Sequence, residues 1–349
     1  MEKTDLIREA IHKAVAGLHL DENQAGEVMD IVMEGEASPA QIAALLIALR
    51  LKGETVEEIT GFARVMRSKA TPIRTRHETV VDTCGTGGDG VNTFNISTAA
   101  ALVVAGCGIP VAKHGNRSVS SRCGSADVLE SLGINIGLTP NQKEECLDRI
   151  GIAFLFAPSL HGAMKHAAGP RREIGVRTVF NVLGPLTNPA GANAQVLGVY
   201  SSDLVPKLAG VLARLGTKGA FVLHGAGGTD EITPVGPAQV CHVSGGKVHS
   251  FELDPLELGI KRAPLDSLKG GSPQENASII NSILSGEKGP QRDAVLLNAA
   301  LALVASENAA TIDEALKIAR QGIDSGEALK KLKELSDFTS KAAVRKAIS

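Results

Sequence analysis

The sequence predicts an α/β protein in which a small N-terminal helical domain precedes a larger domain built on a mainly parallel central sheet. Residues 1–72 contain helical segments with clear capping signals, whereas from Thr79 onward short β-branched runs alternate with helical runs. That alternation is typical of βαβ units. The chain has 349 residues, 43% of them hydrophobic, which is enough to fill the cores of two domains. We therefore expect a helical domain over residues 1–72 and an α/β domain over residues 73–349.

Four helices are expected in the first 70 residues. Asp21 should begin the second, capping boxes starting at Ser38 and Thr55 should begin the third and fourth, and Gly53 should end the third. The run Ile42–Leu49 is apolar on nearly every side, so its helix must be covered on several sides. Because little else in this domain could cover it, we predict that the helical domain forms a homodimer interface.

The larger domain is expected to alternate strands and helices. Its predicted strands are Thr79–Thr83, Ile109–Lys113, Ile134–Ile136, Ala153–Phe156, Gln195–Tyr200 and Ala220–His224. Its predicted helices run up to Ala105 and then over Ser125–Leu132, Asn141–Ile150, His161–Arg172 and Leu204–Leu215. Residues 181–189 read as a turn-rich connector, residues 239–255 as antiparallel strands at one side of the sheet, and about the last 75 residues as helices.

A glycine-rich turn, Gly85–Gly90, joins the first strand to the helix that follows; we call it the glycine loop. Glycines let the backbone approach an anion, and a helix N-terminus adds positive charge, so such turns suit phosphate binding. The spacing also fits a dinucleotide fingerprint, but the acid expected about 20 residues later is replaced by Lys113 and His114. A Walker loop is excluded because no Lys-Ser/Thr follows. A third kind of phosphate loop and a purely structural turn both stay open.

Two further strands end in unusual loops. Lys113–Ser121 offers cations and hydroxyls suited to phosphate oxygens, and His224–Glu231 places Asp230 and Glu231 side by side on a glycine-rich loop. Adjacent carboxylates suit Mg²⁺, which prefers carboxylates together with substrate phosphates. Because ligands bind beyond the carboxyl ends of parallel strands, the three loops together predict a magnesium-polyphosphate substrate. Taken singly, each loop could also be an ordinary solvated turn.

Composition argues against several classes of function. The net charge of −2 comes from 36 basic and 38 acidic residues, and only 3% of residues are aromatic, so we expect no nucleic-acid partner. The N-terminus is charged, and no apolar run reaches the roughly 18 residues of a membrane span, so no membrane association is expected. The five cysteines contain no C-x-x-C pair and indicate reduced thiols in a cytoplasmic protein, with Cys84 and Cys123 as small buried fillers. His161 and His166 are five residues apart and predict no zinc site.

Five motifs in order carry a family resemblance: GTGGDG (85–90), NIST (95–98), KHGNRSVSS (113–121), GSADVLE (124–130) and GTDE (228–231). With them the chain resembles the anthranilate phosphoribosyltransferases of tryptophan biosynthesis, from its helical start to its last helices. The resemblance implies a nucleoside phosphorylase-like fold, usually dimeric, whose helical domain also takes in part of residues 170–190. It implies Mg²⁺-dependent transfer of a 5-phosphoribosyl group from phosphoribosyl pyrophosphate (PRPP) to the amino group of anthranilate, which releases pyrophosphate.

The same resemblance implies the site residues. Mg²⁺ would be held by Ser97, Asp230 and Glu231, and anthranilate by Gly85, Asn116 and Arg171, with the adjacent Arg172 as the alternative arginine. PRPP would meet Gly85, Gly88, Asp89, Thr93, Asn95, Ile96, Ser97, Thr98, Lys113, His114, Gly115, Asn116, Arg117, Ser118, Val119, Ser120, Ser121 and Ser125. His114 is a possible general base. Two other functions remain open: a pyrimidine nucleoside phosphorylase, and a non-catalytic relative that binds nucleic acid.

Overall fold

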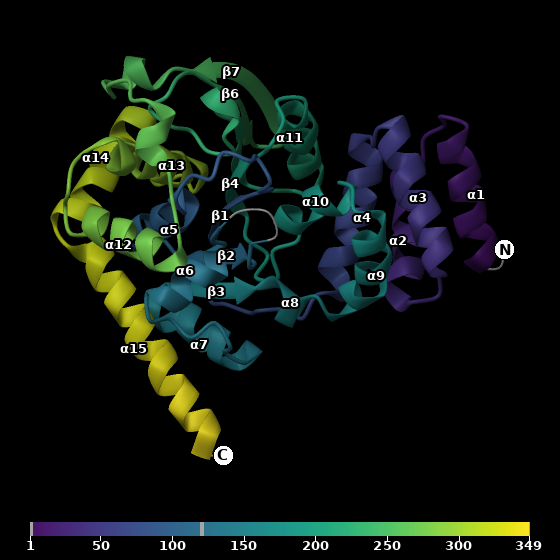
Figure 1. The fold of residues 1–349 in the computed structure, drawn as a ribbon, viewed down its shortest axis with the longest axis horizontal. Helices are drawn as coiled ribbons and strands as arrows, with labels where there is room; N and C mark the ends of the chain where they lie inside the picture. Colours follow the sequence, from purple (N-terminus) through teal and green to yellow (C-terminus); the bar gives the residue numbers. More distant parts are fainter. Residues whose placement is uncertain (1–2, 119–121, 349) are drawn as a thin grey trace.

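The computed structural model describes residues 3–118 and 122–348. A bundle of helices lies beside a larger domain built on one sheet, which confirms the predicted fold class (Figure 1). The N-terminal helices are α1 (Lys3–Val15), α2 (Glu22–Glu34), α3 (Pro39–Lys52) and α4 (Val56–Lys69). The side chains of Asp21, Ser38 and Thr55 each accept the predicted capping hydrogen bond. Gly53 ends α3 at a φ of 84°, in the left-handed range that favours glycine.

The apolar helix α3 is covered within its own chain. Five of its side chains, Ile42, Leu45, Leu46, Ala48 and Leu49, are buried, and α3 packs against α1 and against α9 (Lys165–Ile174). The expectation that little else in the domain could cover this helix was therefore wrong. The covering helix α9 comes from about 100 residues farther along the chain, beyond the reach of a local pattern.

The sheet has seven strands in the order β3-β2-β1-β4-β5-β6-β7. The first five in the chain run parallel, while β6 and β7 are antiparallel to their neighbours. Their bounds are β1 (Val81–Gly85), β2 (Val111–Gly115), β3 (Ile152–Phe156), β4 (Ala194–Gly198), β5 (Gly219–His224), β6 (Ala238–Ser244) and β7 (Lys247–Leu253). The predicted parallel sheet with antiparallel strands at one side is thus confirmed.

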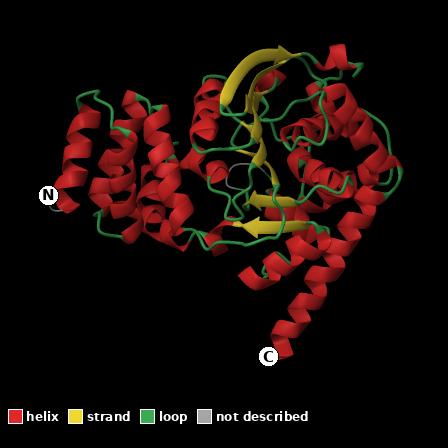
Figure 2. Ribbon diagram, turned by 180° about the vertical axis from the view of Figure 1, so that it is seen from behind, coloured by secondary structure: helices red, strands yellow, loops and turns green. Residues whose placement is uncertain are grey.

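Helices flank the sheet on both sides (Figure 2). The remaining ones are α5 (Ile96–Gly106), α6 (Ser125–Ser131), α7 (Pro140–Ile150), α8 (Ala157–Leu160), α10 (Phe180–Leu183), α11 (Leu204–Arg214), α12 (Pro273–Leu284), α13 (Pro290–Ala305), α14 (Ile312–Asp324) and α15 (Glu327–Ile348). In the part of the chain that the structure describes, no helix combines the length and apolar character needed to cross a membrane.

Two apolar cores occupy the two faces of the sheet. Along β5, Phe221 and Leu223 belong to a core with α5 and α13, whereas Ala220 and Val222 belong to a second core with α11. This follows from the alternation of side chains along a strand. The second core also contains buried apolar residues of α2, α3 and α4, together with Ala167 and the apolar residues between Val179 and Leu186. The helical bundle and one face of the sheet therefore share one continuous core.

Residues 134–136 do not form the predicted strand. Ile134 and Ile136 are buried, but the backbone N–H groups of this segment donate elsewhere. The N–H of Ile134 donates to the carbonyl of Leu129 at the end of α6, and the N–H of Asn135 donates to Oγ1 of Thr339 in α15. The alternation of apolar and polar residues therefore reflects packing of an irregular segment, because its donors are not free to pair with another strand.

Candidate active site

Three loops meet at the carboxyl edge of the parallel strands. The glycine loop follows β1, the loop beginning at Asn116 follows β2, and the loop containing Asp230 follows β5. The chain leaves β1 for β2 on one side, whereas β4 pairs with β1 on the other, so the strand order reverses at β1. Open α/β sheets bind ligands at such a switch point.

The glycine loop needs its glycines for conformation. Gly87, Gly88 and Gly90 have φ values of 63°, 74° and 78°, which side chains with a Cβ rarely adopt. The N–H of Gly87 donates to Oδ2 of Asp230 over 3.0 Å. A backbone donor of the loop thus already faces a negatively charged group.

Two other glycines let Asp230 approach the sheet. A Cβ added to Gly85, at the end of β1, would lie 2.3 Å from Oδ2 of Asp230. A Cβ added to Gly198, at the end of β4, would lie 1.4 Å from the carbonyl oxygen of Asp230. Both distances are far below any real contact. At Gly198 the clash is with backbone, so glycine is required there for residue 230 to lie where it does, whereas at Gly85 a Cβ would displace only the Asp230 carboxylate.

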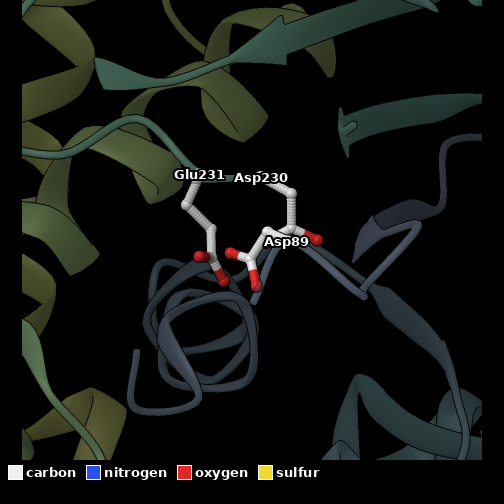
Figure 3. Close-up of side chains that lie close together, drawn as sticks. All are labelled: Asp89, Asp230 and Glu231. Atoms are coloured by element: carbon white, nitrogen blue, oxygen red, sulfur yellow. The ribbon is translucent and has the colours of Figure 1, made fainter. Parts of the chain in front are cut away.

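Three carboxylates from two loops converge here (Figure 3). One oxygen from each of Asp89, Asp230 and Glu231 lies within 4.8 Å of the others. Burial, together with the charge of Asp89, raises the pKa of Asp230 to about 6. Burial and the charge of Asp230 also raise the pKa of Glu231 well above its usual value. Carboxylates held this close repel one another unless a cation or protons neutralise them.

The donor set fits Mg²⁺, since hard carboxylate oxygens are its usual protein ligands. Oδ2 of Asp89 is buried and has no hydrogen-bond partner among the described residues, so one ligand atom is unused. Oγ1 of Thr93 donates to Oε2 of Glu231 over 3.3 Å, which orients that carboxylate. Ser97, the third predicted ligand, lies in the first turn of α5, where its hydroxyl accepts a 3.4 Å hydrogen bond from Nζ of Lys113.

Lys113 is buried beneath the site instead of projecting into solvent. Its ammonium donates to the carbonyl of Thr83 over 2.6 Å, and the whole side chain is buried. Burial lowers the pKa of Lys113, while the nearby carboxylate of Asp82 raises it. Asp82 is fully buried and also accepts hydrogen bonds from the N–H of His114 and from Nδ2 of Asn188.

His114 pairs with His161. Their Nε2 atoms lie 3.2 Å apart, and both rings are buried. Burial and the neighbouring His161 lower the pKa of His114 to about 3. His114 is therefore neutral near pH 7, and one ring donates to the other. Gly115, the next residue, has no room for a Cβ, which would lie 2.2 Å from Oγ of Ser125.

The start of α5 supplies mainly backbone groups and hydroxyls. The side chain of Asn95 is already engaged: its Nδ2 donates to the carbonyl of Cys123, and its Oδ1 accepts from Nδ2 of Asn276. Ile96 is fully buried and could offer a ligand only its backbone. Thr98 is also buried, and its Oγ1 has no hydrogen-bond partner in the described part of the chain.

The loop after β2 is tied to α6. Oγ of Ser125 donates to the carbonyl of Asn116, and the N–H of Ser118 donates to Oδ2 of Asp127. The guanidinium of Arg117 pairs with the carboxylates of Asp127 and Glu130, although it stays exposed. The predicted contacts at Val119, Ser120 and Ser121 lie outside the described residues.

Arg171 and Arg172 differ in their surroundings. Arg171, in α9, is partly buried, with its Cζ 5.0 Å from the centre of the Phe180 ring, and burial lowers its pKa. Arg172 is exposed. A partly desolvated guanidinium benefits more from a bound carboxylate than one in water, which favours Arg171 as the acceptor-site arginine.

Asp89 is the main feature that sequence reasoning missed. It was predicted as a PRPP contact, yet it completes a carboxylate cluster with residues about 140 positions later. The sequence did contain a signal for this role of Asp89: it is an acid within a glycine loop that was expected at the same edge of the sheet as Asp230. Cys123 is buried as predicted, whereas Cys84 is only half-buried. Burial raises the pKa of Cys123 to about 11 and that of Cys84 well above its usual value.

Comparison with known families defines the class of protein. Residues 8–70 match the helical bundle domain of a glycosyl transferase family, and residues 77–329 match the α/β domain of the same family. The two matches together cover the bundle and the sheet.

Individual relatives are more specific. An anthranilate phosphoribosyltransferase from Pelotomaculum thermopropionicum is 63% identical over 345 residues, covering 97% of this chain and 100% of that protein. The crystal structure of the enzyme from Thermus thermophilus is 47% identical with a TM-score of 0.90, covering 95% of this chain and 99% of that one. The Saccharomyces cerevisiae enzyme in complex with PRPP and Mg is 29% identical with a TM-score of 0.87, covering 96% and 98%. The chain belongs to the anthranilate phosphoribosyltransferase family.

Proposed function

We propose that this protein transfers the 5-phosphoribosyl group of PRPP to the amino nitrogen of anthranilate and releases pyrophosphate, a step of tryptophan biosynthesis. The observation that carries the proposal is the three-carboxylate cluster beside the glycine loop, in a chain of this family. A yeast relative has been solved with PRPP and Mg, and another yeast structure contains 4-fluoroanthranilate.

The proposed PRPP site is the glycine loop, the first turn of α5 and the loop after β2. Asp89, Asp230 and Glu231 would hold Mg²⁺. Ser97, whose hydroxyl accepts a hydrogen bond from Lys113, is the further ligand that the family resemblance implies. When bound, Mg²⁺ neutralises charge on the pyrophosphate leaving group. Backbone N–H groups of the loop and the N-terminal end of α5 supply further donors for phosphate oxygens. Arg171, Asn116 and Gly85 are proposed to meet anthranilate.

The reaction needs little acid-base help from the chain. The lone pair of the anthranilate amine attacks the anomeric carbon, the bond from that carbon to the pyrophosphate oxygen breaks, and the amine then loses a proton. An aromatic amine is neutral and nucleophilic near pH 7. With a pKa of about 3, His114 is a weak base, so its proposed role is to shape the site with His161. Holding the two substrates in line supplies much of the rate.

A direct test follows anthranilate fluorescence, which should decay when PRPP and Mg²⁺ are both present and persist when either is omitted. Nucleoside phosphorolysis and DNA retention should be measured beside it. Phosphorolysis of a pyrimidine nucleoside without fluorescence loss would favour a phosphorylase, and retention of DNA alone would favour a non-catalytic relative.

Arg171→Ala should raise the KM for anthranilate about tenfold to a hundredfold, as expected for loss of a charge-assisted hydrogen bond worth about 1.5–3 kcal/mol. The KM for PRPP and kcat should barely change if ground state and transition state lose the contact equally. Arg172→Ala is the matched control, because the exposed neighbour should leave all three constants near their normal values. Normal anthranilate binding in both variants, with weaker PRPP binding, would place the acceptor elsewhere.

We also propose that the bundle domain is completed by residues from 165–186 and forms a homodimer. Val15, Leu18 and Leu51 are 73%, 58% and 83% exposed. Leu18 and Leu51 lie at the same end of the bundle, where Nζ of Lys52 is 2.9 Å from Nδ1 of His19. Exposed apolar side chains gathered at one place commonly mark an interface.

Light scattering at micromolar concentration should report a dimer for the natural protein and a monomer for Leu51→Asp. Val248→Asp is the matched control, because Val248 is an exposed apolar residue on the distant strand β7. A monomeric natural protein, or a Leu51→Asp protein that stays dimeric, would contradict this assignment. We also propose a cytoplasmic location, as expected from a sequence whose cysteines include no C-x-x-C pair.

A further inference from the structure

Arg177 connects the segment after α9 to the glycine loop. Its Nη2 donates to the carbonyl oxygen of Gly88, and its Cζ lies 4.3 Å from the centre of the Tyr200 ring. Tyr200 follows β4, and its N–H donates to Oγ1 of Thr86 over 3.1 Å. Arg177 and Tyr200 therefore hold each other by a cation–π contact while each also holds one residue of the glycine loop.

The contact with Gly88 fixes the orientation of one peptide group. A trans peptide is planar, so its carbonyl and the following N–H point in opposite directions. When the carbonyl of Gly88 faces Arg177, the N–H of Asp89 must face away from Arg177. The same peptide plane sets the direction in which the Asp89 side chain leaves the loop. Gly88 has a φ of 74° and no Cβ, so without an external contact this peptide has few barriers to rotation.

We propose that Arg177, stacked on Tyr200, is a positioning residue for PRPP. It holds the peptide between Gly88 and Asp89 in the orientation that presents the loop donor and the Asp89 carboxylate to the magnesium-pyrophosphate group. Arg177 follows Arg171, the proposed anthranilate ligand, by six residues. This contact therefore also connects the segment that contains Arg171 to the glycine loop. The inference rests on the proposed role of the glycine loop in PRPP binding.

Arg177→Ala should raise the KM for PRPP about tenfold, the size expected for losing one exposed cation–π contact and one hydrogen bond. The KM for anthranilate should stay near normal. Tyr200→Phe keeps a ring face and should behave like the natural protein, whereas Tyr200→Leu should resemble Arg177→Ala. The two losses should not add in the double variant, since both remove the same contact. Arg149→Ala is the matched control: Arg149 is also exposed, with its Cζ 5.9 Å from the Phe338 ring, but it lies in α7.

A second readout does not depend on activity. The chain has one tyrosine and no tryptophan, so protein fluorescence excited near 280 nm arises from Tyr200. Arg177 covers one face of that ring. Acrylamide should therefore quench the emission more strongly in Arg177→Ala than in the natural protein, and Arg149→Ala should leave the quenching unchanged.

Gly88→Val separates failure of this inference from failure of the site itself. If Gly88→Val weakens PRPP binding while Arg177→Ala leaves it normal, the loop assignment stands and the role of Arg177 is wrong. If both variants bind PRPP normally, the loop does not hold PRPP and both proposals fall. A lower melting temperature in Arg177→Ala without a change in the KM for PRPP would make the contact merely structural. A raised KM for anthranilate alone would place Arg177 at the acceptor and overturn the proposal.

Discussion

Changing Asp230 to Asn and Glu231 to Gln together should lower turnover at least a hundredfold and, at the same time, raise the melting temperature of the metal-free protein. The amides keep the shape of the carboxylates but lose the charge that would hold Mg²⁺ against pyrophosphate. Loss of an electrostatic group of this kind costs about 3 kcal/mol or more of transition-state stabilisation. Circular dichroism should confirm that the variant is folded.

The stability gain follows from the raised pKa values. A carboxyl group whose folded pKa lies above its unfolded value stabilises the fold when protonated, and this contribution is lost as the pH rises through the folded pKa. For Asp230 that loss falls between about pH 4 and pH 6, so at pH 7 the charged cluster destabilises the metal-free protein. Neutral amides remove this repulsion. The melting temperature should rise by a few degrees at pH 7 and much less at pH 4.

The control is the adjacent acidic pair Asp313 and Glu314, in the first turn of α14. Asp313→Asn with Glu314→Gln should leave activity normal and should not raise the melting temperature, because these acids favour a helix N-terminus. Near-normal turnover of the Asp230 and Glu231 double variant at saturating Mg²⁺ would show that the metal assignment is wrong.

Gly198→Ala is expected to abolish most activity without touching a ligand atom. The added Cβ would overlap the carbonyl oxygen of Asp230, at 1.4 Å, so either β4 or residue 230 must move. Overpacking of this kind typically costs about 1–3 kcal/mol, which corresponds to a fall in melting temperature of roughly 1–4 °C for a chain of this size. Calorimetric titration should show weakened Mg²⁺ binding.

Gly26→Ala provides the comparison. Gly26 lies in α2, where an added Cβ would come no closer than 3.7 Å to Val65, an ordinary contact. Alanine also favours a helix over glycine, so this variant should keep full activity and equal or greater stability. If Gly198→Ala kept the activity and stability expected of Gly26→Ala, the close approach of Asp230 to β4 would not be needed for activity.

Much of the fold could be predicted because its signals are local. Capping boxes at Ser38 and Thr55 and the β-branched runs before each loop depend on residues a few positions apart. The same holds for the glycine loop, whose turn at Gly88 requires a positive φ. These elements could be predicted from the sequence because residues a few positions apart determine their structure.

The errors and omissions involve distant partners. The helix Ile42–Leu49 could not reveal that α9 covers it, and the run from Ile134 could not reveal that Thr339 would take one of its backbone donors. Asp89 meets Asp230 only because β1 and β5 end at the same edge of the sheet. The role of Arg177 could not be predicted from its neighbours in the sequence, because it depends on contacts with Tyr200 and Gly88.

The shared core of the bundle and the sheet has a consequence for synthesis on the ribosome. Helices α2, α3 and α4 are translated first, yet α9 and the residues up to Leu186 that pack against them arrive roughly 100 residues later. At about 5–20 residues per second, the nascent bundle would present an uncovered apolar face for something like 5 to 20 seconds. The N-terminal helices are therefore a natural early client for a ribosome-associated chaperone, and their burial is complete only after three strands of the sheet have emerged.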